Sequence, residues 1–176
     1  MQQFIRTIDA LDRRIILTLH LRQAKRIRPR ATRMIGWLTH LGGIPLQISL
    51  ILILFVIPQT RPMGIKLLIA QLFVTMLVQL VKHGIARTRP YEAIAGITPR
   101  QVERDSSFPS GHTASAFTAA MIIGCFYPAI QFFLLIVAGF IGYSRIHIGV
   151  HYLTDVIAGS GIGIVVSALI LLVHGL

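Results

Sequence analysis

Long apolar segments separated by short polar ones dominate the chain after residue 33. Five of these segments predict helices that cross a membrane: one from Met34 or Ile44 to Ile57, and others at about 65–81, 110–126, 129–143 and 156–173. Their lengths lie at the low end of what a helix needs to cross a hydrocarbon core of about 30 Å. The pattern therefore predicts an all-α integral membrane helical bundle of about five transmembrane helices in residues 34–176.

Residues 1–33 have a different pattern. Apolar side chains recur there at roughly helical spacing, at Phe4, Ile5, Ile8, Leu11, Ile15, Leu19 and Leu21. Many of the remaining positions are Lys or Arg, and Thr18 and His20 interrupt the longest apolar stretch. Such a segment predicts an amphipathic helix that lies at a membrane surface. Together the two parts predict a single membrane domain over residues 1–176.

Composition agrees with the hydropathy pattern. The chain is 54% hydrophobic and 13% charged, with a mean hydropathy of +0.72, which is typical of membrane proteins. The net charge of +11 does not indicate a nucleic-acid partner, because no recognition motif accompanies it. Basic residues beside apolar spans instead reflect topology and attraction to anionic lipid. The expected partner is therefore the lipid bilayer, and nothing indicates an oligomeric state.

The segment from Ser144 to Asp155 gathers ionisable side chains between two apolar runs. Unpaired charge is costly near a membrane, so such a cluster predicts a functional site. His151 and Asp155 are four residues apart, and on a helix the carboxylate would reach the imidazole. A carboxylate on one ring nitrogen fixes the tautomer and leaves the other nitrogen as a base or nucleophile. Arg145 adds a fork-shaped cation suited to phosphate.

The predicted topology places further polar residues beside this cluster. They lie at the ends of four apolar segments, with Lys82 and Arg89 after the second, His112 at the start of the third, Arg145 at the end of the fourth, and His151 and Asp155 at the start of the fifth. Since consecutive spans alternate in direction, all these ends emerge on one side of the membrane. The sequence therefore predicts a shared site there.

Three motifs contain these residues: Lys82 with six residues before Arg89-Pro90; Pro109-Ser110-Gly111-His112; and Ser144-Arg145 with five residues before His151 and three more before Asp155. Their order and spacing resemble the tripartite signature of the type-2 phosphatidic acid phosphatase family. The resemblance covers residues 82–155 directly. The front of the chain departs from it, because many membrane members have six spans and the first is here replaced by the basic surface helix.

Phosphoryl transfer also explains the choice of residues. Its transition state spreads charge over three equatorial oxygens, so cations and oriented amides do most of the work. Lys82, Arg89 and Arg145 can supply three positive charges. Ser110 and Gly111, at a helix start, can supply a hydroxyl and backbone amides. The predicted site therefore needs no metal ion and no other cofactor.

The two histidines have different predicted roles. His151 is the predicted nucleophile, which gives a phosphohistidine intermediate, and Asp155 orients its ring. His112 is the predicted general acid for the leaving alkoxide and later the base for water. The resemblance implies the same roles at these positions. The predicted activity is therefore that of a membrane lipid phosphatase acting on a phosphomonoester or a diphosphate.

The resemblance implies four kinds of substrate: phosphatidylglycerophosphate, phosphatidic acid, undecaprenyl diphosphate and the lipid A phosphates. No residue pattern ranks them, because tail recognition is spread over apolar side chains. The alternative from another class is a catalytically silent membrane protein that binds lipid phosphate in the same pocket. Such a protein would not need both His112 and His151.

Three other patterns have simpler interpretations. His147, His151 and Asp155 are spaced by four and could form a metal-binding face, but Gly149 weakens the helix and the nearby cations would repel a metal ion. Interfacial anchoring is predicted for Arg87, Arg100 and Arg104. Helix packing rather than a nucleotide loop is predicted for Gly159, Gly161 and Gly163, because no strand precedes them.

Two arguments disagree about the side that the site faces. Of the 17 Lys and Arg residues, only Arg61 and Lys66 would lie on the side opposite the site, so the positive-inside rule predicts a cytoplasmic site. The resemblance implies an extracytoplasmic site in the cell membrane. A surface helix that binds anionic head groups accounts for part of the basic excess. We therefore predict an extracytoplasmic site.

Overall fold

The computed structural model describes residues 8–19, 35–36, 39–99 and 102–174. Regular structure in these residues is entirely helical, and they include no strand. The predicted alternative start of the first span at Met34 lies outside the described residues, as does Arg100. The all-helical class is therefore confirmed for the described part of the chain.

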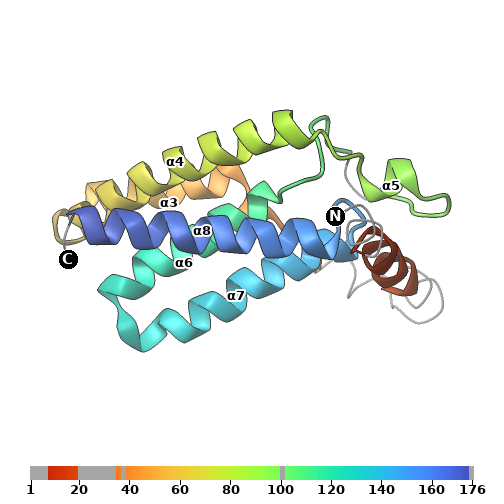
Figure 1. The fold of residues 1–176 in the computed structure, drawn as a ribbon. Helices are drawn as coiled ribbons and strands as arrows, with labels where there is room; N and C mark the ends of the chain where they lie inside the picture. The colour runs from red at the N-terminus through yellow and green to blue at the C-terminus, as the bar shows by residue number, and fades with distance from the viewer. Residues whose placement is uncertain (1–7, 20–34, 37–38, 100–101, 175–176) are drawn as a thin grey trace.

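Five long helices form the bundle, and Figure 1 shows them running side by side. They are α3 (Ile44–Val56), α4 (Arg61–Ile85), α6 (Gly111–Phe126), α7 (Pro128–His147) and α8 (Leu153–His174). Three short helices connect or flank them, namely η1 (His40–Gly42), η2 (Pro58–Thr60) and α5 (Pro90–Ala93). Helix α6 occupies the middle of the bundle, because it packs against α4, α7 and α8.

Helices α4, α7 and α8 extend beyond the predicted segments, whereas α3 and α6 do not. Helix α4 begins with Pro62 in its first turn and ends where Ala86 adopts a left-handed conformation, with φ of 46°. Helix α7 continues past the predicted end at residue 143 to His147. Within the described residues, three helical segments are long and apolar enough to cross a membrane, whereas α3 and α6 have 13 and 16 residues. The number of spans therefore stays a prediction.

Glycines on α8 bring it close to α6. A Cβ added at Gly159 would lie 2.5 Å from the carbonyl oxygen of Ser110, and one at Gly163 would lie 2.5 Å from that of Ala114. Small residues allow this approach between membrane helices. Gly161 has open space around it. The packing prediction is therefore confirmed for Gly159 and Gly163 and is wrong for Gly161.

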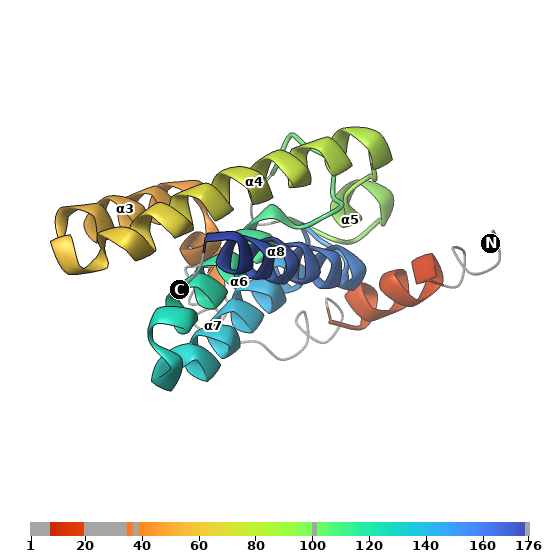
Figure 2. The same cartoon turned by 60° about the vertical axis from the view of Figure 1, so that its left-hand side comes forward.

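A separate N-terminal helix, residues 8–19, lies at the end of the bundle where α8 begins (Figure 2). Its Ile16 is fully buried in a cluster with Ile94, Ile97, Ile146 and Tyr152. This helix is the described part of the predicted surface helix at 1–33. Its position at a membrane surface stays a prediction.

Candidate active site

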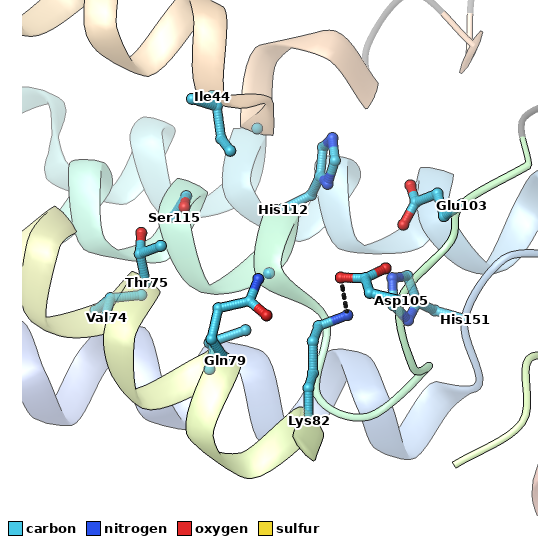
Figure 3. A pocket seen from close by; sticks show the side chains of 13 residues that line it. Ile44, Val74, Thr75, Gln79, Lys82, Glu103, Asp105, His112, Ser115 and His151 are labelled. Atoms are coloured by element: carbon cyan, nitrogen blue, oxygen red, sulfur yellow. Dashed lines mark ion pairs between the residues drawn. The ribbon is translucent and has the colours of Figure 1, made fainter. Parts of the chain in front are cut away.

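The predicted site residues meet at one end of the bundle, and four of them, Lys82, Gly111, His112 and His151, line a cavity of about 130 Å³. Figure 3 shows Lys82, Glu103, Asp105, His112 and His151 around it. Ile44, Val74 and Val78 also line the cavity and make one side of it apolar. The structure thus brings together side chains from the ends of α4, α6 and α8 with the loop that precedes α6.

His151 and Asp155 are in contact and fully buried. Nδ1 of His151 lies 3.4 Å from Oδ2 of Asp155, and Nε2 lies 3.3 Å from Nη1 of Arg89. Since a carboxylate only accepts and a guanidinium only donates, the proton lies on Nδ1 and Nε2 carries the lone pair. Burial lowers the pKa of His151 to about 4, so its ring is neutral at pH 7.

The helical geometry expected for this pair is wrong. His151 lies in the loop between α7 and α8, where Gly149 has φ of 81°. The carboxylate of Asp155, in the first turn of α8, accepts a hydrogen bond from the amide of Tyr152 at 2.8 Å. That contact resembles one half of a capping box. Asp155 therefore caps its own helix while it holds the ring of His151.

Lys82 and Arg89 form a buried pair of cations. Nζ of Lys82 lies 2.6 Å from the carbonyl oxygen of Ser106 and 2.9 Å from Asp105. The guanidinium of Arg89 binds the carbonyl oxygen of Val150 at 2.9 Å and Asp105 at 2.6 Å. Lys82 is 5% exposed and Arg89 is 1% exposed. Their charges are therefore held in fixed positions rather than in solvent.

Arg145 lies at the end of α7 and is fully buried. Its Nη1 donates to the hydroxyl of Thr39 at 2.7 Å, and its Nη2 binds the carboxylate of Glu103. Its Nε has no hydrogen-bond partner among the described residues. Arg145 therefore keeps one buried donor for which the described chain supplies no acceptor.

Two carboxylates from the loop before α6 form ion pairs with Lys82, Arg89 and Arg145. Glu103 joins Arg89, at 2.8 Å, to Arg145, and Asp105 joins Lys82 to Arg89. Burial raises the pKa of both carboxyls, but the cations outweigh it and hold the pKa of each below its usual value. Anionic oxygens are therefore bound where the sequence predicts phosphate. None of the three sequence motifs contains Glu103 or Asp105.

Ser110, Gly111 and His112 form the start of α6 as predicted. The amide of Ser110 donates to the carbonyl oxygen of Asp155 at 3.0 Å, and its hydroxyl lies 2.9 Å from that of Thr113. Ser110 does not line the cavity, so its phosphate contact stays a prediction. Gly111 and His112 do line it, and amides in the first turn of a helix have no intrahelical acceptor.

Gly42 and Gly43, which precede α3, pack closely against His112. A Cβ added at Gly42 would lie 2.7 Å from the backbone oxygen of His112, and one at Gly43 would lie 3.6 Å from its Nε2. Only glycine fits at Gly42 without displacing the start of α6. The imidazole of His112 is thereby held at the edge of the cavity.

The interfacial role predicted for Arg87 is wrong. Its guanidinium is 18% exposed and binds Asp155 at 2.7 Å and Asp12 at 2.9 Å. The signal in the sequence is the small number of acids: all six Asp and Glu residues lie on the side predicted to carry the site. With so few carboxylates available, those near basic residues were candidates for pairing. Arg104 is exposed, and its position at a membrane interface stays a prediction.

The metal-binding alternative gains no support from the described residues. They contain no cluster of three His, Cys, Asp or Glu side chains that could hold a metal ion. The ring of His147 lies beside that of Tyr143, with 5.6 Å between their centroids. His147 ends α7, while His151 lies in the following loop, so the single helical face required by that alternative does not form.

Fold and site together define a helical membrane protein with a cationic, histidine-containing site at one end of its bundle. The family model of the PAP2 superfamily matches residues 63–175, and the chain belongs to that superfamily. The predicted family membership is therefore confirmed. The match includes every residue of the three motifs.

Two relatives show the chemistry found in this family. Phosphatidylglycerophosphatase B of Bacillus subtilis (strain 168) is 28% identical over 165 residues, which cover 81% of this chain and 75% of the relative. An undecaprenyl-diphosphatase of Sulfolobus acidocaldarius is 32% identical over 121 residues, which cover 66% of this chain and 58% of the relative. Both relatives are named as phosphatases of lipid substrates.

A solved structure supports the fold. The crystal structure of the PAP2-type phosphatidylglycerolphosphate phosphatase from Bacillus subtilis matches with a TM-score of 0.81 and 24% sequence identity. The match covers 96% of this chain and 86% of that protein. The arrangement of the bundle is thus that of a PAP2 membrane phosphatase.

Proposed function

We propose that this protein is an integral membrane lipid phosphatase that hydrolyses a phosphomonoester or a diphosphate. The observation that carries the proposal is the neutral His151, whose Nδ1 is held by Asp155 while its Nε2 lies among buried cations. A nucleophile needs an available lone pair, and the departing group needs positive charge around it. His151 and Lys82 line one cavity, and Arg89 contacts Nε2 of His151.

In the proposed reaction, Nε2 of His151 attacks the terminal phosphorus and the bond from that phosphorus to the departing oxygen breaks. The departing group is the lipid alkoxide for a phosphomonoester and the lipid monophosphate for a diphosphate, and His112 gives its proton to the departing oxygen. Water then attacks the phosphohistidine, His112 takes the proton from that water, and inorganic phosphate leaves. Asp155 stabilises the positive charge that develops on the ring of His151. The cycle ends with both histidines in their starting protonation states.

Three side chains supply the charge for this reaction: Lys82, Arg89 and Arg145. The amides of Gly111 and His112 add neutral donors and the positive end of the α6 dipole. The substrate phosphate would displace Glu103 and Asp105 from the cations. Because these cations are fixed in the protein, we propose that no metal ion is required.

The substrate class follows from the surroundings of the cavity. Ile44, Val74 and Val78 give it an apolar side, which suits a lipid tail next to a charged head group. The relatives named as acting on phosphatidylglycerophosphate and undecaprenyl diphosphate support this class. We therefore propose phosphatidylglycerophosphate, phosphatidic acid, undecaprenyl diphosphate and the lipid A phosphates as candidate substrates.

The test is phosphate release by the purified protein in detergent micelles, with each candidate lipid supplied in turn. We expect turnover of at least one lipid, persistence of that turnover in excess chelator, and inhibition by vanadate. Loss of activity in chelator that zinc restores would overturn metal independence. Saturable vanadate binding without release of phosphate from any lipid would favour the silent lipid-phosphate-binding protein.

We also propose that the site faces the extracytoplasmic side of the cell membrane. Thr98 is exposed in the loop before α6 and can be replaced by cysteine in a Cys125→Ser background. The predicted topology puts Gln2 on the same side, and it gives a second position for cysteine. Both cysteines should react with a membrane-impermeant thiol reagent in intact cells. Labelling only after lysis would place the site in the cytoplasm.

A further inference from the structure

We propose that Arg87 is a positioning residue for Asp155, and that Asp12 makes the N-terminal helix a working part of the active site. The inference rests on the proposed function, because it concerns the carboxylate that orients His151. It goes beyond the three motifs, none of which assigns a role to Arg87 or to residues 8–19.

Arg87 holds the side of Asp155 that faces away from His151. Its Nη1 lies 2.7 Å from Oδ1 of Asp155. The other oxygen, Oδ2, accepts hydrogen bonds from Nδ1 of His151, from the hydroxyl of Ser107 at 2.5 Å and from the amide of Tyr152 at 2.8 Å. A carboxylate bound on both oxygens cannot rotate without breaking a contact. Arg87 therefore fixes the oxygen on which the tautomer of His151 depends.

The backbone of Arg87 contributes to the same arrangement. Its carbonyl oxygen accepts a hydrogen bond from the amide of Ser107 at 2.8 Å, and the hydroxyl of Ser107 donates to Asp155. The guanidinium also lies 4.0 Å from the ring centroid of Tyr152, whose amide donates to Asp155. Arg87 is thus linked to Asp155 directly and through two of its other donors.

Asp12 of the N-terminal helix holds Arg87 from the other side. Its Oδ2 lies 2.9 Å from Nη2 of Arg87, and it also accepts the hydroxyl of Thr154. Its Oδ1 accepts the amide of Thr154 at 3.2 Å. Thr154 directly precedes Asp155, so Asp12 fixes the backbone beside the orienting carboxylate as well as the guanidinium.

The burial of Asp12 separates it from its neighbour Asp9. Asp12 is 2% exposed, whereas Asp9 also binds Arg87 at 2.9 Å but is 54% exposed. Removing one partner of a buried pair leaves an uncompensated charge, while exposed pairs contribute little. The two aspartates reach the same guanidinium from the same helix and therefore form a matched pair for experiment.

The first experiment measures kcat and KM of the full-length protein in micelles with dioctanoyl phosphatidic acid. Arg87→Met should lower kcat by about 10- to 100-fold and leave KM within about twofold, as for other residues that orient a catalytic group. Arg87→Lys should restore part of kcat, because it keeps the charge but loses the fork. Arg61→Met, at the opposite end of α4, should match the wild type.

The N-terminal helix is tested with the two aspartates. Asp12→Asn should lower kcat by roughly 3- to 10-fold without a matching change in KM, and Asp9→Asn should have a smaller effect. Equal and small effects of both changes would overturn the role of the helix. If Arg87→Met does not fold, Arg87→Lys and Asp12→Asn carry the same test.

A double-mutant cycle separates positioning from general stability. If Arg87 acts through Asp155, Arg87→Met should lower kcat by less than about twofold in an Asp155→Asn background. Independent, multiplying losses would overturn the inference even though the wild type is active. Absence of phosphate release by the wild type from every candidate lipid would instead overturn the proposed function. The same cycle on thermal unfolding needs no substrate and would show no coupling if Arg87 and Asp155 do not interact.

Discussion

The two ends of α4 carry the same kinds of side chain in different surroundings. At its carboxyl end, Lys82 is 5% exposed and is bound by Asp105 and a loop carbonyl. At its amino end, Arg61 is exposed and donates to the carbonyl oxygen of Phe55, and Nζ of Lys66 lies 5.7 Å from the ring centroid of Phe126. Hydropathy alone treats these cations alike.

The difference lies in what burial costs. A cation taken out of water loses several kcal/mol of solvation free energy unless protein partners replace the water. That loss is comparable to the whole free energy of unfolding of a small domain. At the active-site end, carboxylates surround Lys82, Arg89 and Arg145. At the other end the cations stay near the surface. Buried, paired cations therefore distinguish the end of the bundle that carries the proposed active site.

The largest expected effect is at His151. His151→Ala should lower kcat by a factor on the order of 10⁴ or more, because the proposed covalent step loses its nucleophile. His83→Ala is the matched control, since His83 is exposed on the last turn of α4. Phosphate release from the active lipid measures both variants. Turnover near the wild-type rate in His151→Ala would contradict the proposed mechanism.

The next effect separates the two histidines. His112→Ala should lower kcat by about 10²- to 10⁴-fold on a lipid alkyl phosphate, because the departing alkoxide needs a proton. The loss should be much smaller on an aryl phosphate, whose departing group is already a weak base. Comparing kcat on the two substrates measures this difference. An equal loss on both would mean that His112 is not the general acid.

The comparison of the helix ends is tested directly with two lysines. Lys82→Met should lower kcat/KM by about 10²- to 10³-fold, as expected when one fixed charge is removed from the transition state. Lys66→Met, on the same helix, should change kcat/KM by less than about twofold. Both are measured on the same lipid at one ionic strength. Similar values for the two variants would remove the functional distinction between the ends.

The smallest effect concerns stability and pH. The cations Lys82 and Arg89 overcome burial and hold the pKa of Asp105 below its usual value of 3.8. The stability that Asp105 contributes is therefore fully present above the usual pKa and is lost as the pH falls through the lower, folded-state pKa. In micelles at about pH 6, the wild type should have a higher midpoint of thermal unfolding than Asp105→Asn. This difference in midpoint should shrink to zero in strong acid. A gap that widens in acid would contradict this pairing.

The sequence predicted the helices well because hydropathy reports burial in lipid directly. It placed their ends less well, since these depend on backbone geometry such as the left-handed Ala86 and on the continuation of α7 to His147. The His151–Asp155 contact was predicted because four residues separate the partners. Its actual geometry, from a loop to a helix start, depends on a cap that the spacing does not specify.

Long-range pairing accounts for what the sequence did not predict. Arg87 and Asp12 are separated by 75 positions, and Arg145 and Glu103 by 42. No local spacing rule links such residues, so Arg87 was assigned to the interface and Glu103 received no role. Charge counts could have suggested pairing, because the chain has only six acidic residues and 17 basic ones. They could not have indicated which acid meets which base.

The close packing of α8 on α6 has a mechanical consequence. His112 begins α6 and Asp155 begins α8, and the amide of Ser110 joins the two starts through the carbonyl of Asp155 at 3.0 Å. With Gly159 against the same turn, the two helices should move as one rigid unit. In the proposed reaction, a lipid would then enter or leave by displacement of other elements, while the starts of the two helices that carry His112 and Asp155 keep their separation.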